Sequence, residues 1–368
     1  MAPSLQALAA ALLGLASAAA ASPRLNVAMT LESASNGVSV SPDNRQFLVF
    51  PPLDGTEGPQ VAERTESGLS AYPNEAWNSY SSGKNPARHF LRANAQRIGP
   101  DGALWVVDTG SPPSEGRVVL PGGPKLVKID LASNTVSRVY LLGNVSRPNS
   151  FVDDVRFHPC QGKAYLTDAG APGLIVLDLG SGEAKRMLDD HPSTRGYMPI
   201  SGEGSLLYGT DGKPAYLHAD QLEVSPDGRW FYYQPANGGM SRIETKHLDR
   251  AFHDAKLRGE LGRYVEPFAL TPSTGGTAID AEGNIYVSDT DRLAIQRIRP
   301  SGKVETLIQD DRLVWVDAMW VDSRGQLWLP AAQLNRGAPF NGGKSHIQKP
   351  VYVFTFHIGV GPPKIDHL

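Results

Sequence analysis

One short unit occurs six times in the chain and constrains its fold more than any other feature. Each copy begins with a tight turn rich in Pro, Asp, Gly or Asn and continues into a run of aromatic and β-branched residues. This order predicts a hairpin turn followed by a strand with one buried face. The copies occupy residues 41–50, 99–108, 158–168, 225–234, 280–289 and 322–331.

Further β-rich runs flank these units, as at 152–157 before one turn and at 125–131 after another. Three or four antiparallel strands, repeated six times at intervals of about 40–70 residues, are typical of propeller blades. A single blade cannot bury both faces, so the blades close into one ring. We therefore predict an all-β, six-bladed β-propeller. The alternative is a β-sandwich whose turns resemble one another by chance.

The first 22 residues differ from the rest of the chain. They are rich in Ala and Leu and end in small residues that fit an Ala-x-Ala cleavage site before Pro23. We predict a signal peptide over 1–21, because the apolar run is too short for a membrane anchor and proline stops a helix. Residues 22–368 then form a single propeller domain of a secreted protein that does not contact the membrane after cleavage. Two insertions, 56–92 and 179–217, are predicted to form loops over one face.

Charge and cysteine content narrow the classes of function. The 35 Lys and Arg residues against 38 Asp and Glu give a net charge of −3, without the basic stripe that a nucleic-acid partner requires. Cys160 is the single cysteine, so no internal disulfide forms, and it is expected to be a small buried hydrophobe. Asn144 begins the sequon Asn144-Val145-Ser146 and is the predicted glycosylation site. We expect a monomer whose partner is a small molecule.

Common catalytic motifs are missing from the sequence. It contains no His-Glu-x-x-His, no paired Cys ligands, no Gly-x-Ser-x-Gly elbow and no phosphate loop. Zinc hydrolysis of the usual kind, ordinary serine hydrolysis and nucleotide chemistry therefore lack support.

The start of each innermost strand faces one mouth of a propeller channel. Carboxylates and amides that converge there would suit a hard cation, a protonated amine or general acid–base catalysis. The alternative is that these side chains and water only satisfy one another. The residues at this level are Asn36, Asn94, Asp153, Asp154, His218, Asp220, Gln221, Gly275, Gly276 and Asp317.

Within this set Asp154, Asp220 and His218 are the predicted catalytic residues, because their side chains can move a proton near neutral pH. Aromatic residues could form a pocket wall, although at strand spacing they more often belong to a core. The aromatic residues considered are Tyr72, Trp77, Trp105, Tyr165, Trp315, Trp320 and Trp328. The predicted ligand-binding residues are Asn36, Asn94, Asp153, Gln221, Asp317, Tyr72 and Trp77.

Three aspartates recur at the end of the second strand of different blades: Asp108, Asp168 and Asp289. Their repetition predicts a structural role as hydrogen-bond acceptors.

Several segments resemble the yellow and major royal jelly protein family. The most specific pair is LWVVDTG at 104–110 followed by PKLVKIDL at 124–131. The other matching segments are FLVFPP at 47–52, Ala71-Tyr72-Pro73 with Trp77-Asn78, 152–155, 164–168 with 173–178, and WFYYQP at 230–235.

The resemblance implies a secreted six-bladed propeller with a small aromatic or amine ligand in its channel. For some relatives it implies isomerase activity on an indole-quinone such as dopachrome. The cysteines often paired in insect members are missing, and the chain is more similar to microbial relatives. We therefore expect isomerisation or cyclisation of an aromatic or quinonoid metabolite, in pigment or secondary metabolism and without an obligatory cofactor. The alternative is a carrier or scavenger that leaves its ligand unchanged.

A more distant resemblance, by position only, is to gluconolactonase-like propellers, which hold a divalent cation with Glu, Asn and Asp. It implies metal-dependent lactone hydrolysis as a further alternative. The corresponding residues here are Asn36, Asp154, Asp220 and Asp317.

Overall fold

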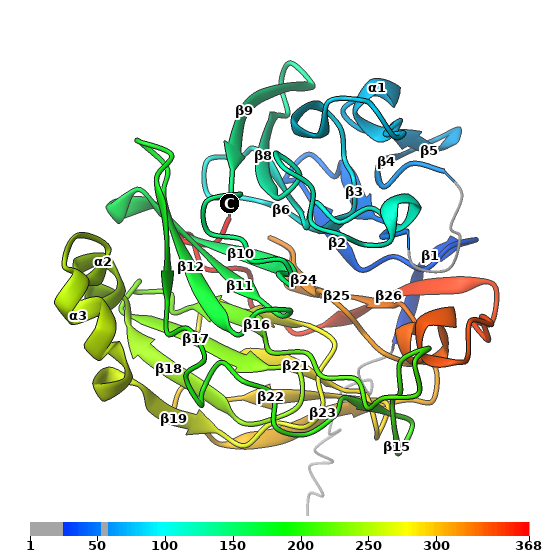
Figure 1. The fold of residues 1–368 in the computed structure, drawn as a ribbon. Coiled ribbons are helices and arrows are strands. Elements are labelled where there is room, and N and C mark those ends of the chain that lie inside the picture. Colours follow the sequence, from blue (N-terminus) through cyan, green and yellow to red (C-terminus); the bar gives the residue numbers. More distant parts are fainter. Residues whose placement is uncertain (1–24, 53–57, 368) are drawn as a thin grey trace, which may run out of the picture.

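Six four-stranded antiparallel sheets surround a central axis (Figure 1). This computed structural model describes residues 25–52 and 58–367. It confirms the predicted all-β, six-bladed propeller. The predicted signal peptide lies outside the described residues. Within the described ranges, every helix is too short or too polar to span a bilayer.

Five blades are built from strands that follow one another in sequence, from the channel outwards. Blade 1 contains β2 (Gly37–Val40), β3 (Gln46–Val49), β4 (Val61–Thr65) and β5 (Gly68–Ala71). Blade 2 contains β6 (Ala93–Ile98), β7 (Leu104–Asp108), β8 (Lys125–Asp130) and β9 (Thr135–Leu141). Blade 3 contains β10 (Val152–His158), β11 (Lys163–Asp168), β12 (Gly173–Asp178) and β13 (Ala184–Met187). Blade 4 contains β16 (Ala219–Val224), β17 (Trp230–Pro235), β18 (Met240–Glu244) and β19 (Glu266–Ala269). Blade 5 contains β20 (Thr277–Ile279), β21 (Ile285–Asp289), β22 (Ala294–Ile298) and β23 (Val304–Gln309).

Blade 6 closes the ring with strands from both ends of the propeller. It contains β24 (Trp320–Val321), β25 (Gln326–Ala331), β26 (Val351–His357) and, outermost, β1 (Asn26–Leu31). Figure 1 shows the blue strand β1 beside the red strand β26, and the pairing aligns Leu31 with Val351. Backbone hydrogen bonds therefore join the first blade strand to the last.

The repeated unit supplies the turn and the second strand of every blade. In the turn before β7, Gly102 has φ 72°, a conformation that glycine adopts without strain. The alternating apolar residues that follow pack between neighbouring blades. Trp105, for example, contacts Phe157 of the next blade with ring centroids 4.9 Å apart. Trp105, Tyr165, Trp320 and Trp328 all belong to these inter-blade cores.

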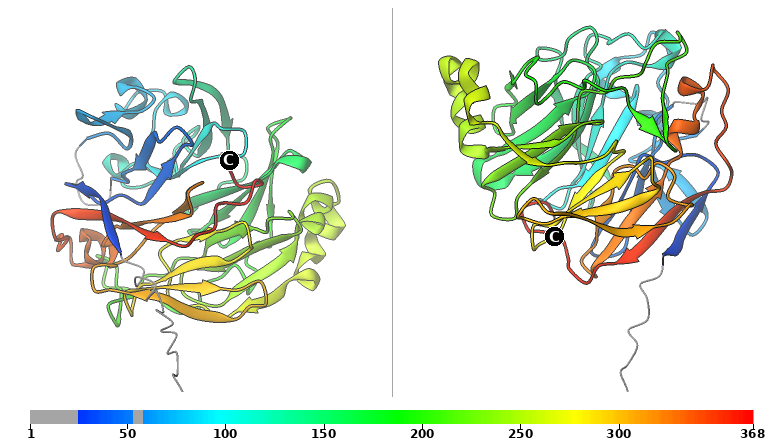
Figure 2. Two further views of the ribbon diagram at one scale, coloured as in Figure 1. Left: turned by 180° about the vertical axis from the view of Figure 1, so that it is seen from behind. Right: turned by 90° about the horizontal axis from the view of Figure 1, so that it is seen from below.

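Short helices and loops decorate the ring. The helices are α1 (Glu75–Asn78), α2 (Thr245–His253), α3 (Ala255–Glu260), η1 (Pro86–Arg88), η2 (Pro113–Glu115), η3 (Pro159–Gln161), η4 (Leu261–Tyr264), η5 (Leu334–Arg336) and η6 (Ala338–Phe340). Both views in Figure 2 show α2 and α3 at the outer edge of the ring. Cys160, in η3, is exposed, contrary to the expected burial, because it lies in a surface turn rather than in a strand.

The two predicted insertions differ in what they form. The segment 56–92 is in part blade structure, because it contains β4 and β5, so its interpretation as a loop over one face was wrong there. In the segment 179–217, strand β13 completes blade 3, and the hairpin of β14 (Ser201–Gly202) and β15 (Ser205–Leu206) follows.

The C-terminal tail crosses the channel at the far ends of the innermost strands. Asp366 Oδ2 lies 2.5 Å from Arg97 Nη2, near the end of β6. The His367 ring stacks on Trp320 with centroids 3.6 Å apart, and its Nε2 donates to the carbonyl oxygen of Val321 over 2.7 Å. Burial opposes ionisation of Asp366, but the charge of Arg97 outweighs it and holds the pKa of Asp366 below its usual value. The tail thus covers one mouth of the channel.

Candidate functional site

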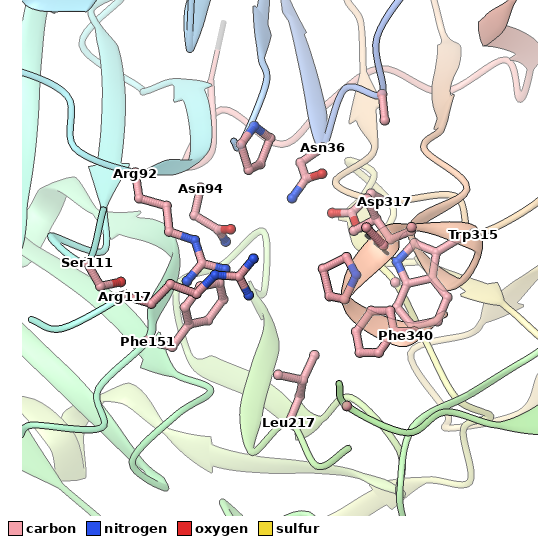
Figure 3. A pocket seen from close by; sticks show the side chains of 18 of the residues that line it. Asn36, Arg92, Asn94, Ser111, Arg117, Phe151, Leu217, Trp315, Asp317 and Phe340 are labelled. Carbon is pink, nitrogen blue, oxygen red and sulfur yellow. Dashed lines mark hydrogen bonds between the residues drawn. The ribbon is translucent and has the colours of Figure 1, made fainter. Parts of the chain in front are cut away.

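A cavity of about 1220 Å³ occupies the opposite mouth (Figure 3). Residues at or just before the start of the innermost strands form its floor, as the repeat register predicts. The residues predicted at this level that line it are Asn36, Asn94, Asp153, Asp220, Gly275 and Asp317. Asn36 Oδ1 is buried and accepts no hydrogen bond within the described part of the chain, so it is available to a ligand.

The walls include residues that sequence reasoning missed: Arg92, Arg117, Phe151 and Phe340. Arg92 and Phe151 directly precede β6 and β10, so their positions next to the innermost strands are the sequence signal that marks them. Arg117 and Phe340 come from connections inside blades 2 and 6, where the repeat carries no signal. Of the seven aromatic residues named from the sequence as a possible pocket wall, Trp315 lines the cavity.

Three innermost strands contain β-bulges at the cavity floor. A bulge adds a residue to one strand and re-aims the side chains beside it. Asn94, Asp153 and Asp220 lie within these irregular stretches, which lets them face the cavity. The register shifts lie between Ala93 and Ala95, between Val152 and Val155, and between Ala219 and Leu222.

Asp153 and Asp220, from neighbouring blades 3 and 4, are hydrogen-bonded to each other through their side chains. Asn94 Nδ2 also donates to Asp153 Oδ1 over 2.6 Å. Burial raises the pKa of Asp153 to about 7. Burial and the neighbouring Asp153 carboxyl raise the pKa of Asp220 well above its usual value. Near neutral pH the pair therefore holds at least one proton, as two adjacent carboxyls in a desolvated site do.

Asp317 is held on the blade 6 side of the floor. Its Oδ2 accepts from Trp315 Nε1 over 3.2 Å and its Oδ1 from the Ala318 N–H over 2.9 Å. Burial raises its pKa well above the usual value. Gly275 of the neighbouring blade leaves room for this loop, because a Cβ there would lie 2.5 Å from the Val316 carbonyl oxygen.

Asp154 points away from the large cavity. Its Oδ2 accepts from Arg156 Nη1 over 2.6 Å and its Oδ1 from the Val155 N–H over 2.7 Å. Arg156 also binds both carboxylate oxygens of Glu223, over 2.9 and 2.8 Å. Asp154 thus belongs to an ion-paired layer in the channel below the floor, beside a small cavity of about 20 Å³.

Two other predicted polar residues also lie beside the floor rather than on it. His218 Nδ1 accepts a hydrogen bond from the Gly196 N–H over 3.1 Å, and burial lowers the pKa of this imidazole. Gln221 Nε2 donates to the Thr274 carbonyl oxygen over 2.8 Å, and its side chain borders the small cavity. His218 is not among the residues that line the large cavity.

Tyr72 and Trp77 are not brought to the cavity. Tyr72 is buried in the core beside blade 1 and donates from its hydroxyl to Asn134 Oδ1 over 3.0 Å. Trp77 packs against Phe90 with ring centroids 5.2 Å apart. Asn144, the predicted glycosylation site, lies in an exposed turn after β9.

The recurring strand-end aspartates act as hydrogen-bond acceptors, which confirms their predicted structural role. Asp108 accepts from the Arg92 N–H over 3.0 Å and pairs with the Lys125 ammonium over 2.7 Å. Asp168 accepts from the Phe151 N–H over 2.9 Å. These aspartates therefore hold the backbone of two residues that form the cavity wall. Asp289 instead accepts from the Arg292 N–H and from Gln296 Nε2.

The residues proposed for a divalent cation do not form one coordination site. Both oxygens of Asp154 are occupied by protein donors, and Asp154 borders the small cavity below the floor rather than the large one. Among residues 25–52 and 58–367, no group of three His, Cys, Asp or Glu side chains is arranged to hold a metal ion.

Solved structures share the propeller fold with this chain at low sequence identity. A gluconolactonase from Xanthomonas campestris has 12% identity and a TM-score of 0.55, covering 91% of this chain and 89% of that chain. A luciferin-regenerating enzyme has 14% identity and a TM-score of 0.54, covering 92% and 97%. The calcium-binding protein regucalcin from Agrobacterium tumefaciens has 12% identity and a TM-score of 0.52, covering 91% and 92%. At these identities the likeness concerns the fold.

No curated protein matches the chain in sequence. The family described as Major royal jelly protein matches residues 96–348, which include most of blades 2 to 6 and most of the cavity floor. This match agrees with the motifs at 104–110 and 124–131. The chain therefore belongs to the major royal jelly protein family.

Proposed function

We propose that the protein binds a small aromatic or quinonoid metabolite in the large cavity and catalyses its isomerisation by proton transfer. The observation that carries the proposal is the hydrogen-bonded pair Asp153 and Asp220 at the floor of a cavity with aromatic walls. We also propose that the mature protein acts outside the cell as a monomer.

The pair suits a reaction that moves a proton without net oxidation. In its ionised form Asp153 accepts a proton from the ligand, while neutral Asp220 donates one to another ligand atom. The ligand gains and loses one proton, so its composition is unchanged. Afterwards the proton on Asp153 passes to Asp220 across their hydrogen bond, which restores the starting state. General acid–base catalysis of this kind contributes about 10²–10⁴-fold to a rate.

The aromatic wall would orient the ring of the ligand. Trp315 and Phe340 lie across the cavity from Phe151 in Figure 3. Trp315 is fixed through its hydrogen bond to Asp317, so its indole is a rigid surface for stacking. A ring held between these side chains would lie above the floor carboxyls, where its exchangeable protons can be reached.

The test is to incubate the purified protein with indole-quinones, dopachrome among them, and to follow absorbance and product structure. In D₂O the product should gain deuterium at the isomerised position, faster with protein than without. Asp153→Asn should abolish the acceleration, while Glu66→Gln, on an exposed turn of blade 1, should not. Saturable binding without product would favour the carrier alternative, and neither binding nor turnover would overturn the proposal.

A further inference from the structure

Two guanidinium groups converge on the cavity from blade 2. Figure 3 shows the Arg92 and Arg117 side chains pointing toward each other beside Phe151, across from Trp315. Arg92 directly precedes β6 and is only 9% exposed. Arg117 lies in the connection between β7 and β8 and is exposed to the cavity mouth.

Neither guanidinium forms a hydrogen bond or ion pair with another residue in the ranges 25–52 and 58–367, and Arg92 Nε is a buried donor with no acceptor there. Other buried arginines of the channel differ: Arg156 is bidentate with Glu223, and Arg97 pairs with Asp366. The Arg92 guanidinium lies over the Phe151 ring, 4.6 Å from its centroid. A buried cation without a counter-ion is costly, so these donors are available to a ligand.

The nearby carboxyls are engaged elsewhere. Asp108 pairs with Lys125, and Asp153 is bound to Asn94 and Asp220. Burial, and after it the charge of Arg117, lower the pKa of Arg92 to about 10. An anion between the two guanidiniums would remove this repulsion and supply the missing acceptor.

We propose that Arg92 and Arg117 form an anion-binding subsite, and that the natural ligand of the cavity is an aromatic carboxylic acid. This inference rests on the proposed function and names its substrate class. The carboxylate lies between the guanidiniums, and the ring extends along Phe151 toward Trp315. The reacting atoms then lie over Asp153 and Asp220.

A monoanion fits the cavity better than a dianion such as a phosphate monoester. The Asp153 carboxyl is close enough to Arg92 to interact with its charge. A second negative charge on a ligand bound to Arg92 would therefore be repelled by ionised Asp153. Lys349 adds positive charge at the mouth, whereas Glu32 and Asp211 add negative charge. All three are exposed, so solvent and salt screen them more than Arg92.

The test is a calorimetric titration at pH 7 with indole-3-acetate and its neutral isostere indole-3-acetamide. We expect the acid to bind at least about tenfold more tightly than the amide, because charge-assisted hydrogen bonds are stronger than neutral ones. Arg117→Gln should remove most of this preference and leave amide binding unchanged. This site is exposed, so the variant should fold normally. Arg92→Gln should act in the same direction. Arg250→Gln, on the exposed face of α2, is the matched control.

The outcomes of the titration test this inference and the proposed function separately. Equal binding of acid and amide, or an acid preference that survives in both arginine variants, overturns the anion subsite and leaves an aromatic ligand in place. Tighter binding of phenyl phosphate than of benzoate overturns the carboxylate assignment. Acid-selective binding that depends on Arg117, combined with no turnover of any aromatic acid, supports the subsite and overturns the isomerase. Absence of binding by every probe overturns both.

Discussion

The side chains of Asp153 and Asp220 are hydrogen-bonded to each other across the gap between blades 3 and 4. Each lies in a bulged stretch at the start of an innermost strand, so the contact depends on two local irregularities of the sheet. A regular strand would alternate its side chains between the two faces of the blade. The bulges therefore create a proton-sharing pair in a place where regular blades would not.

Activity should depend on pH through Asp153. Its pKa is raised to about 7, and only the ionised form can accept a proton. We therefore expect kcat for isomerisation to rise as the pH increases through about 7, and Asp153→Asn to lower kcat about 10²–10⁴-fold. A pH profile of initial rates checks both. A variant with the kcat of the wild type would rule out Asp153 as the base.

Stability should fall as the pH rises from about 4 to 7. Asp153, Asp220 and Asp317 have raised pKa values in the folded state, so over this range the folded protein holds protons that the unfolded chain has lost. Each such group lowers the free energy of unfolding by up to about 1.4 kcal/mol per pH unit. In Asp220→Asn, urea denaturation at several pH values should show a smaller decline. If the unfolding free energy of this variant declined with pH as steeply as that of the wild type, Asp220 would not have a raised pKa in the folded protein.

The loop that holds Asp317 should be sensitive to the neighbouring blade. In Gly275→Ala the new methyl group would lie 2.5 Å from the Val316 carbonyl oxygen and 3.0 Å from Trp315 Nε1. We expect a loss of about 1–3 kcal/mol in unfolding free energy and altered tryptophan fluorescence, because the loop must move. Gly143→Ala, where a Cβ meets no atom within 4 Å, is the control. Equal stability of the two variants would contradict the tight packing.

The C-terminal ion pair should contribute to stability without affecting the ligand. Asp366→Asn leaves Arg97 buried without its counter-charge, and we expect a loss of about 3–5 kcal/mol. Probe binding in the cavity should be unchanged below the melting temperature, since the tail lies at the other mouth. Asp311→Asn, at an exposed position, serves as the comparison. Thermal melting measures the loss of stability, and calorimetric titration well below the melting temperature measures probe binding.

A chelator should leave both the melting temperature and the proton-transfer activity unchanged, because both oxygens of Asp154 are bound by protein donors and no group of three His, Cys, Asp or Glu side chains in the described residues is arranged to hold a metal ion. Metal analysis by mass spectrometry is the direct measurement. A near-stoichiometric divalent ion, whose removal lowers the melting temperature, would instead favour the lactone-hydrolase alternative.

The fold could be predicted because the turn and the strand after it recur in every blade. The floor of the site followed from the same repeat, which placed Asn36, Asn94 and Asp220 at one level. Asp154 was predicted to be catalytic and Asp153 to bind the ligand, but the sequence does not show which of the two faces the cavity, because a bulge of one residue reverses it. The structure turns Asp153 to the cavity and pairs Asp154 with Arg156.

The cavity walls were harder to predict than the floor. Arg117 and Phe340 lie in connections that differ from blade to blade, so no periodicity marks them. Tyr72 and Trp77 follow a family motif, but their rings pack on Phe47 and Phe90 in the core beside blade 1. A residue can therefore belong to a family motif because it packs in the core, and not because it contacts a ligand.

The pairing of β1 with β26 has a consequence for the order of folding. The partner of the first strand is the last strand of the ring, so during synthesis five blades can form while β1 is still unpaired. Joining strands so far apart in sequence is slow, because the entropy of closing a long loop must be overcome first. Until then β1 is an unpaired strand and the outward faces of the two end blades are uncovered, so both are open to other chains. Ring closure is therefore the step at which the nascent protein is most exposed to aggregation.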